Sequence, residues 1–284
     1  MVFLRQLGMS IVCCLPLLAG AAAGDCPAMT RVGVSDLGLS AYRDGDKVAG
    51  AAVDIVKEVA RRAGCKVKFI WLPRQRLFVE MEAGRIDMTM GAVHLPERDA
   101  YASYLPYAYL QYDLVLFRRD DRQYTGLADF VAHGTGRLNI TRGIRYDPAI
   151  ETLLGRLAST GRLESVSDFD TVFNKMELGR ADGTLASPPI YTKFLRMERF
   201  RGQLEVIPLP EAESQFTGIY VSRRSLSASE RRNYAMAVKS LIADQAALPI
   251  YSRYFDEATV KRLFRLGQAP LAAAVAAMLA STEP

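Results

Sequence analysis

The sequence is poor in the residues on which most metal and nucleic-acid sites depend. Its 284 residues include only two histidines, four cysteines and one tryptophan, so little metal chemistry is expected. Lysine and arginine outnumber aspartate and glutamate by only 36 to 31, and the surplus is scattered, which argues against a nucleic-acid-binding surface. Half of the residues are apolar and 24% are charged. This balance excludes a disordered chain and predicts one large globular unit or two modest lobes.

The first apolar run, from Ile11 to Ala19, is shorter than the 18 or so residues that cross a membrane. It follows Arg5 and precedes a run of three alanines that ends at Ala23, a pattern typical of a secretory signal peptide. A lipid anchor would need a cysteine directly after a small residue at the cut, which Cys26 does not provide. We therefore predict a signal peptide at 1–23, cleaved near Ala23, and a soluble periplasmic protein.

Cleavage would leave two cysteines, Cys26 and Cys65, in an oxidising compartment, where cysteines tend to pair. Each lies shortly before a strand-like run, 31–34 and 67–71. If these runs form neighbouring parallel strands, their starting points come together. We expect a disulfide, and two reduced, buried thiols are the alternative.

Short apolar runs alternate with helical patterns along the mature chain, which predicts an α/β fold with mostly parallel sheets flanked by helices. The first series of strands and helices covers 31–35, 51–63, 67–71, 77–83 and 86–90. The second covers 138–141, 148–158, 163–166, 171–178 and 183–186. The sequence 81–87 recurs in similar form at 176–182, and each copy ends a helix with glycine and starts a strand. Two α/β lobes follow from this pattern.

Two extended runs, 106–117 and 216–222, lie between and after these series and suggest a two-strand hinge. Ser227 and Glu230 have the spacing of a capping box that opens a helix to about Ala246, and another helix is expected near 257–266. The C-terminal helices then return to the first lobe. The expected boundaries are lobe 1 at 24–109 and 213–270, lobe 2 at 110–212, and a C-terminal tail at 271–284.

Five short motifs occur in a fixed order along the mature chain. They are Gly50–Asp54, Gly84–Asp87, Pro96–Arg98, Pro106–Tyr107 and Gly179–Asp182. Each is weak alone, but in this order the chain resembles the periplasmic solute-binding proteins of ABC importers, amino-acid-type family 3, over nearly all of its mature length. The resemblance implies a two-lobed clamp that closes on a small ligand and delivers it to an ABC transporter membrane permease. We expect a monomer.

The resemblance also implies where the first lobe holds its ligand. Arg98 follows a loop at the carboxyl end of a strand, where the family uses an arginine to grip a ligand carboxylate, and a guanidinium can donate two parallel hydrogen bonds to such a group. Val93 and Leu95 replace small hydroxyl residues that often flank this loop. The ligand-binding residues expected in this lobe are Arg98, Gly91, Ala92, Val93, Tyr42, Trp71 and Arg76.

Several of these assignments have alternatives. Arg98 can be a surface arginine, and Tyr42 takes the place of a family lid residue but can also pack within its loop. Trp71 can stack on a flat ligand or fill a half-buried packing site. Either Arg74 or Arg76 can face the cleft, and the sequence alone does not decide between them.

In the second lobe the resemblance places the ligand beside the strand-to-helix turn 140–146. Helix N-termini attract anions, so an acidic group of the ligand is expected there. Arg142, Arg145 and Tyr146 lie on this turn and are expected ligand contacts, although either arginine can point to solvent. Ser187 stands where the family has an aspartate that binds the α-ammonium group of the ligand. A neutral hydroxyl supplies no counter-charge, so the anionic or zwitterionic ligand need not be an α-amino acid.

An enzyme is one alternative to a binding protein. The sequence has no Gly-x-Ser-x-Gly motif, and the glycines at 134 and 136 lack the third glycine of a dinucleotide fingerprint. Some periplasmic dehydratases of cyclic carboxylic acids share the implied fold, and His94 is the one attractive acid or base. A subunit that presents its ligand to a membrane sensor would have nearly the same sequence. We expect a non-enzymatic binding protein with no cofactor, metal or nucleic-acid partner.

Overall fold

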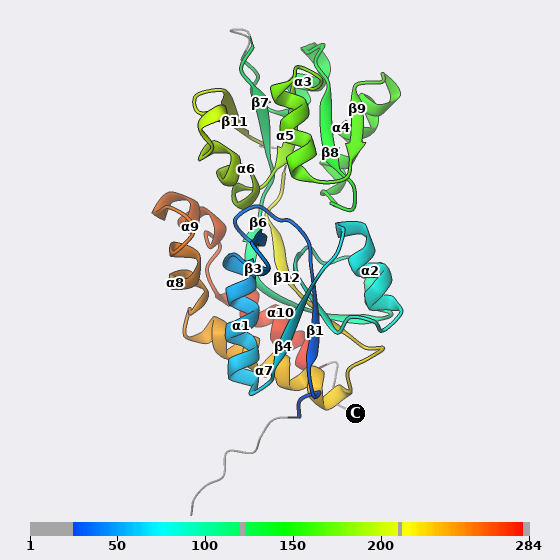
Figure 1. Ribbon diagram of the computed structural model, residues 1–284, viewed down its shortest axis with the longest axis vertical. Helices are drawn as coiled ribbons and strands as arrows, with labels where there is room; N and C mark the ends of the chain where they lie inside the picture. The colour runs from blue at the N-terminus through cyan, green and yellow to red at the C-terminus, as the bar shows by residue number, and fades with distance from the viewer. Residues whose placement is uncertain (1–24, 120–122, 210–211, 281–284) are drawn as a thin grey trace, which may run out of the picture.

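The computed structural model describes residues 25–119, 123–209 and 212–280, and the predicted signal peptide lies outside these ranges. The described chain forms two lobes, one above the other in Figure 1, each built on a five-stranded sheet. We call lobe 1 the part built on the sheet with strand order β4-β1-β5-β12-β6, and lobe 2 the part built on β11-β7-β10-β8-β9. The predicted two-lobed α/β clamp is confirmed.

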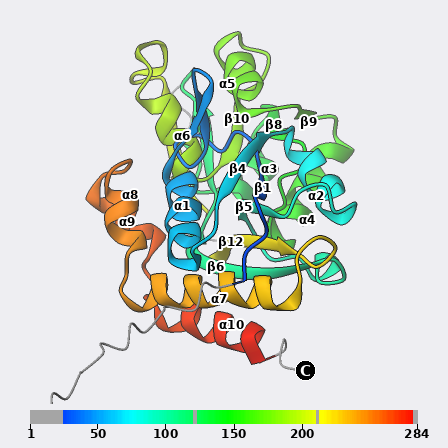
Figure 2. The same cartoon turned by 60° about the horizontal axis from the view of Figure 1, so that its bottom comes forward.

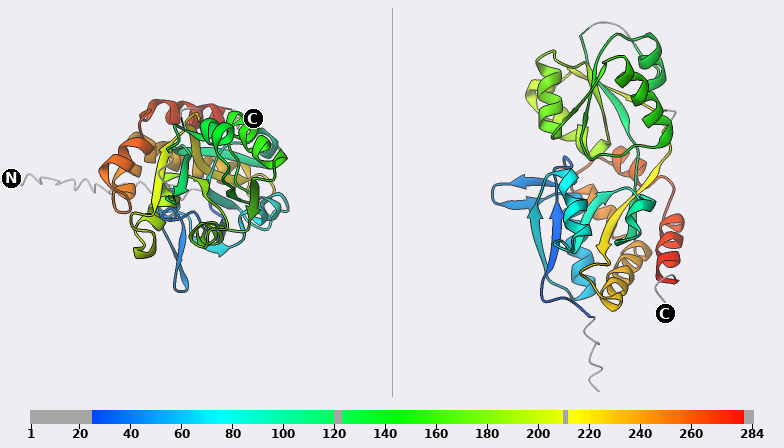
Figure 3. Two further views of the ribbon diagram at one scale, coloured as in Figure 1. Left: turned by 90° about the horizontal axis from the view of Figure 1, so that it is seen from above. Right: turned by 90° about the vertical axis from the view of Figure 1, so that its right-hand side faces the viewer.

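In the sheet of lobe 1, four strands run in one direction and the fifth runs against them. Strand β1 pairs in parallel with β4 and β5, and β12 runs antiparallel to both β5 and β6. The strands are β1 (Thr30–Val34), β4 (Val67–Trp71), β5 (Met88–Ala92), β6 (Ala102–Leu110) and β12 (Gln215–Ser222). A hairpin of β2 (Tyr42–Asp44) and β3 (Lys47–Ala49) projects from this lobe, as the right-hand view of Figure 3 shows.

The helices of lobe 1 come from both ends of the chain. Helix α1 buries its apolar residues against the core and ends at Gly64, which takes a left-handed conformation as the C-cap. The helices are α1 (Ala51–Ala63), α2 (Arg74–Glu82), α7 (Ala228–Ala243), α8 (Ala247–Ser252), α9 (Glu257–Leu263) and α10 (Ala269–Ala280), with a 3₁₀ turn at Pro96–Arg98. The predicted capping box of Ser227 and Glu230 opens α7.

Lobe 2 is one continuous stretch of chain. Its strands are β7 (Asp113–Phe117), β8 (Leu138–Thr141), β9 (Leu163–Val166), β10 (Gly183–Ala186) and β11 (Leu204–Pro208). Its helices are α3 (Leu127–His133), α4 (Pro148–Ser159), α5 (Phe169–Glu177) and α6 (Pro188–Leu195), with a 3₁₀ turn at Glu198–Phe200. Strands β8, β9 and β10 are parallel, whereas β7 is antiparallel to β10 and β11.

Two neighbouring strands carry the chain between the lobes. Strand β6 leads up to lobe 2 and β12 leads back, and the two pair along their length from Gln215 opposite Leu110 to Ser222 opposite Ala102. Just beyond this pair, the fully buried Asp113 carboxylate forms a two-pronged ion pair with Arg262 of α9, at 2.5 and 2.7 Å. The expected hinge is therefore a pair of hydrogen-bonded strands, and an ion pair connects its end to the C-terminal helix α9.

The C-terminal residues belong to lobe 1. Residues 271–280, predicted as part of a tail, form most of α10, which lies beside α7 and against β6. Figure 2 shows α7 and α10 side by side below the sheet, and Leu271, Val275 and Leu279 of α10 are buried. Apolar burial explains why this segment forms a helix on the lobe. Within the described ranges, no helix has the length and apolar character needed to cross a membrane.

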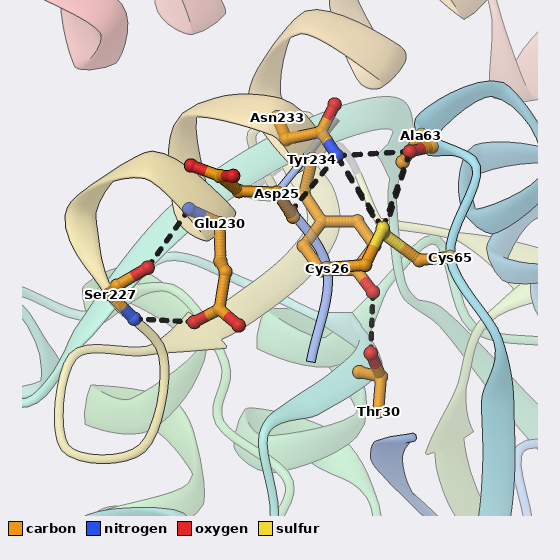
Figure 4. Close-up of a disulfide and its surroundings, with 9 residues drawn as sticks. All are labelled: Asp25, Cys26, Thr30, Ala63, Cys65, Ser227, Glu230, Asn233 and Tyr234. Atoms are coloured by element: carbon orange, nitrogen blue, oxygen red, sulfur yellow. Dashed lines mark hydrogen bonds between the residues drawn. A yellow bond between two sulfur atoms is a disulfide. The ribbon is translucent and has the colours of Figure 1, made fainter. Parts of the chain in front are cut away.

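The disulfide between Cys26 and Cys65 is present, with 5.4 Å between the Cα atoms. The parallel register of β1 and β4, which sets Thr30 opposite Val67, brings the two cysteines together. Figure 4 shows the amide of Asn233 beside the bridge, where it donates to the Ala63 carbonyl at 2.9 Å. The predicted pairing is confirmed, and it ties the first strand of lobe 1 to the end of α1.

The repeated sequence at 81–87 and 176–182 has the same geometry in both lobes. Asp87 accepts a hydrogen bond from the Arg31 backbone N–H at 2.7 Å, and Asp182 accepts one from the Arg137 backbone N–H at 2.7 Å. Gly84 and Gly179 have the same positive φ of 70°. The repeat therefore marks equivalent helix-to-strand junctions in the two lobes.

Candidate functional site

A cleft lies between the lobes at the carboxyl ends of the parallel strands, where open α/β sheets bind their ligands. It holds about 630 Å³ of empty space, open solvent included. The lining residues come from both lobes and from both hinge strands. They are Leu37, Ser40, Arg74, Gly91, Val93, Arg98, Tyr107, Tyr109, Leu110, Tyr112, Gly143, Ile144, Arg145, Ser187, Pro189, Ile190, Thr217, Tyr251 and Leu263.

The lobes touch each other at the edge of this cleft. The Leu39 backbone N–H of lobe 1 donates to the Pro189 carbonyl of lobe 2 at 2.8 Å. Gly38 has a φ of 60°, and a Cβ on it would lie 2.3 Å from the same carbonyl oxygen, so this contact requires glycine. Lys193 of α6 also forms an ion pair with Asp36 of lobe 1 at 3.2 Å. The structure therefore shows the two lobes in direct contact.

Arg98 lies at the end of the 3₁₀ turn that follows β5, and its side chain is directed into the protein. Only 7% of the residue is exposed. Its guanidinium carbon lies 3.3 Å from the ring centroid of Phe78 and 5.4 Å from that of Tyr220. Stacking of this kind holds the guanidinium plane against the ring and leaves its N–H groups, which lie in that plane, able to donate to other partners.

Arg74 lies in the first turn of α2, directly after β4, and is 8% exposed. Its Nη2 donates to the Gly91 carbonyl at 2.9 Å and its Nη1 to the Met90 carbonyl at 3.5 Å, while Nε is buried without a partner. Burial lowers the pKa of Arg74 to about 10, and the nearby charge of Arg98 acts in the same direction. The surroundings therefore disfavour the positive charge of Arg74, but the guanidinium stays protonated at physiological pH.

The groups around Arg74 supply no negative charge. Burial raises the pKa of Tyr107 to about 12 and raises those of Tyr112 and Tyr251 as well, so these phenols stay neutral. The cleft lining contains no aspartate or glutamate. Across 25–119, 123–209 and 212–280, no carboxylate lies within ion-pair distance of Arg74 or Arg98. Two positive side chains thus share a largely buried site without a protein counter-ion.

Lobe 2 faces this pair mainly with backbone and a hydroxyl. Gly143, Ile144 and Arg145 line the cleft, and Arg145 is exposed at its rim. Ser187 precedes α6 but makes no capping hydrogen bond with its side chain, so its hydroxyl is available to the cleft. The N-terminus of α4, an expected anion site, is instead capped by Asp147, which accepts from the Ile150 N–H at 3.0 Å. That helix end is already satisfied by a carboxylate of the protein.

The cleft brings together five of the eleven residues expected from the sequence: Gly91, Val93, Arg98, Arg145 and Ser187. Ala92 is buried at the end of β5, outside the lining. Tyr146 is buried against Tyr112, with ring centroids 4.6 Å apart. Arg142 is exposed and does not line the cleft.

Three expected residues of lobe 1 lie elsewhere. Tyr42 is in the projecting hairpin and Trp71 is half-buried, with the Arg43 guanidinium 5.1 Å from its ring centroid. Arg76 is exposed and pairs with Glu80 at 3.2 Å. The choice between Arg74 and Arg76 thus falls on Arg74, because 74 shares a helix face with the buried Leu77 and Met81.

Sequence reasoning missed most of the hydrogen-bonding groups contributed by the hinge and the C-terminal helices. Tyr107 and Tyr112 come from the hinge region, Thr217 from β12 and Tyr251 from α8. Thr217 and Tyr251 reach the cleft because the chain returns to lobe 1 after lobe 2. For Tyr107 and Tyr112, the aromatic character of the first hinge run was the available signal in the sequence.

Two α/β lobes with a lined cleft between them define a ligand-binding clamp. The sequence matches the bacterial extracellular solute-binding proteins, family 3, over residues 31–283. The chain belongs to this family, and the resemblance found in the sequence motifs is confirmed.

Solved structures share this fold. The arginine-, lysine-, histidine-binding protein ArtJ from Geobacillus stearothermophilus has a TM-score of 0.67 and 16% identity, covering 80% of this chain and 94% of ArtJ. A histidine kinase sensor domain similar to periplasmic binding proteins has a TM-score of 0.66 and 17% identity, with coverages of 80% and 96%. The ancestral amino acid-binding protein AncCDT-1, a precursor of cyclohexadienyl dehydratase, has a TM-score of 0.65 and 16% identity, covering 81% of this chain and 96% of AncCDT-1. No curated protein sequence matches the chain.

Proposed function

We propose that this chain is a periplasmic receptor that binds a small carboxylate-bearing solute, an amino acid or a related organic acid, between its lobes and delivers it to an ABC importer. The observation that carries the proposal is the presence of two buried guanidinium groups in a cleft with no acidic lining residue. Arg98 is the principal carboxylate receptor, and Gly91, Val93, Arg145 and Ser187 are further contacts.

The electrostatics of the cleft support an anionic ligand. A buried charge without a partner is costly, and an ion pair with good hydrogen bonds offsets much of that cost. A ligand carboxylate on Arg98 would supply the missing charge in an environment that strengthens hydrogen bonds. A ligand held by groups from both lobes also favours the closed arrangement, because only that arrangement satisfies both sets of contacts.

A thermal-shift screen on refolded, ligand-stripped protein tests the proposal. The screen pairs each carboxylate with its neutral amide, and includes amino acids and simple amines. A ligand at 100 times its Kd should stabilise the protein by about 2.7 kcal/mol. We expect stabilisation by carboxylates and not by their amides. Stabilisation by amines or amides alone would contradict an anion-binding cleft.

A dehydratase-like enzyme on the same fold is the second candidate, and AncCDT-1 is the similarity that favours testing it. His94, the one residue expected to act as an acid or base, is exposed, binds the Asp99 carboxylate at 2.9 Å and does not line the cleft. Incubation of the purified protein with each stabilising ligand, followed by NMR, separates the two functions. Unchanged ligand after prolonged incubation supports a receptor, and a dehydrated product supports an enzyme.

A ligand-sensing subunit for a membrane receptor is the third candidate, and the likeness to a histidine kinase sensor domain favours testing it. Radiolabelled ligand uptake distinguishes the roles, because deletion of the gene abolishes uptake in an importer. A sensor subunit changes gene expression in response to ligand while uptake continues.

A further inference from the structure

We infer that the ligand is a dianion, and that Arg74 receives its second acidic group. The inference rests on the proposed function, in which Arg98 holds the first. It assigns to Arg74 a ligand-binding role that the sequence left open between Arg74 and Arg76.

The two guanidinium groups lie against one aromatic ring. The guanidinium carbon of Arg98 lies 3.3 Å from the centroid of Phe78, and that of Arg74 lies 5.7 Å from it. Both side chains line the same cleft, and both are more than nine-tenths buried. A compact ligand with two acidic groups can therefore contact both guanidinium groups at once.

The hydrogen bonds of Arg74 leave donors free for a ligand. A guanidinium has five N–H donors, and Arg74 uses one on the Gly91 carbonyl and directs another at the Met90 carbonyl, at a longer 3.5 Å. Its Nε is buried and has no partner. Buried donors of this kind are nearly always satisfied in proteins. A second ligand carboxylate would accept from the remaining donors.

Charge balance separates a dianion from a monoanion. The lining holds Arg74, Arg98 and Arg145 and no acidic residue, and Arg145 is exposed to water at the rim. A monocarboxylate would neutralise only one of the two buried guanidinium groups. Two acidic groups, either two carboxylates or one carboxylate and one phosphonate, would neutralise both. The neighbouring tyrosines would supply neutral O–H donors and apolar ring surface.

A purely positional role for Arg74 makes a different prediction. In that case its side chain only holds the carbonyls of Met90 and Gly91 and so shapes the loop that precedes Arg98. Loss of Arg74 would then weaken every ligand by the same factor. A ligand-contacting Arg74 instead weakens diacids selectively.

Calorimetry on a matched ligand set decides between these roles. The set contains the straight-chain dicarboxylates from malonate to adipate, the monoamide of each, and the phosphonate analogues in which one carboxylate is replaced. The proteins are the parent, Arg74→Gln, Arg74→Lys and the control Arg76→Gln, which changes an exposed arginine of the same helix turn.

In the parent we expect the best dianion to bind at least tenfold more tightly than its monoamide. Arg74→Gln should weaken that dianion at least tenfold while the monoamide changes by less than threefold, so that the preference disappears. Arg74→Lys should keep part of the preference, and Arg76→Gln should match the parent. The phosphonate arm shows which of the two dianion types is preferred, and a preference for either supports the inference.

Equal binding of dianions and monoamides by the parent would overturn the inference, and this comparison requires no variant to fold. An equal loss of both ligands in Arg74→Gln would also overturn it and leave Arg74 a positioning residue. In both cases monocarboxylate binding that depends on Arg98 would keep the proposed function intact. If neither carboxylates nor phosphonates bind the parent, both proposals fail together.

Discussion

Lys193 of lobe 2 reaches Asp36 of lobe 1, with 3.2 Å between Nζ and Oδ2. The same ammonium group lies 2.9 Å from Asp170 within its own lobe. Burial raises the pKa of Asp36, an effect that the charge of Lys193 opposes. The lobe contact therefore places a partly buried carboxylate where it depends on a cation from the opposite lobe.

Removal of this cation should favour the open clamp. In Lys193→Met the partly buried Asp36 loses its partner from the opposite lobe, so we expect three- to tenfold weaker ligand binding and a larger radius of gyration in ligand-free protein. Small-angle scattering and calorimetry measure the two effects. Lys175→Met is the control, because Lys175 pairs with Glu164 inside lobe 2. Unchanged scattering and affinity in Lys193→Met would show that the pair does not contribute to closure.

Arg98→Ala should weaken binding of the best carboxylate by at least tenfold to a hundredfold. Hydrogen bonds to charged groups contribute about 1.5 to 3 kcal/mol each, and every 1.4 kcal/mol is a factor of about ten in Kd. Arg98→Lys should recover only part of the affinity, because an ammonium group cannot reproduce the two-pronged geometry. Calorimetry checks both variants, and circular dichroism confirms that they fold. Binding as tight as that of the parent in Arg98→Ala would be incompatible with a carboxylate receptor at this position.

Arg74→Met should leave the ligand-free protein at least as stable as the parent. The lowered pKa of Arg74, about 10, corresponds to an unfavourable burial of roughly 3 kcal/mol, which the substitution removes. The lost bonds to the Gly91 and Met90 carbonyls act in the opposite direction and offset part of this gain. Thermal unfolding of ligand-stripped protein measures the result. A fall of several degrees in Tm would show that Arg74 stabilises the ligand-free fold.

Acid should destabilise lobe 1 through Asp87. Burial tends to raise its pKa, but the hydrogen bonds from Arg31 lower it, and the net shift is downward. The stabilisation is therefore complete above the ordinary carboxyl pKa near 4 and is lost as the pH falls through the lower folded-state value.

Asp87→Asn should cost about 2 to 3 kcal/mol at pH 7, because the buried Asp87 carboxylate loses its charge and its hydrogen-bonded pairing with the partly exposed Arg31 guanidinium. It should also flatten the fall of the unfolding free energy below pH 4. Urea titrations between pH 2 and 7 measure this profile, with Asp46→Asn in the exposed hairpin turn as the control. A parallel acid profile for parent and Asp87→Asn would assign the acid sensitivity to other carboxylates.

The disulfide should account for roughly 3 to 4 kcal/mol of stability in the chain-entropy model, given the 39-residue separation of its cysteines. The variant with Cys26→Ser and Cys65→Ser should lose about that amount in urea unfolding. Thiol titration of denatured, unreduced protein that begins at Gly24 should find no free thiol. Two free thiols would show that the bridge does not form.

The sequence predicts the fold more completely than the site. The strands predicted at 67–71, 138–141, 163–166 and 183–186 coincide with those in the structure, because apolar runs bounded by turn residues determine them locally. Arg98 is placed in the cleft by the same local logic, since it follows β5 at the end of a short loop.

The rest of the site depends on packing between segments distant in sequence. Tyr251 reaches the cleft only because α8 returns to lobe 1 after lobe 2 is complete. At the start of α4, where the sequence predicts an anion contact, the Asp147 carboxylate caps the helix, an N-cap pattern that the sequence does contain. Arg74 was separable from Arg76 by its three- and seven-residue spacing from Leu77 and Met81.

Strand β12 lies between β5 and β6 in lobe 1, yet it follows the whole of lobe 2 along the chain. A polypeptide made from its N-terminus therefore has all five strands of lobe 2 before it has the last strand of lobe 1. Domains generally fold as units as their residues become available, so lobe 2 can mature while the sheet of lobe 1 is still divided. The arrival of β12 joins β5 to β6, sets the second hinge strand beside the first and brings Thr217 to the cleft. Lobe 1, which begins first, is thus finished last, because the helices that bring Tyr251 and Leu263 to the cleft follow β12 along the chain.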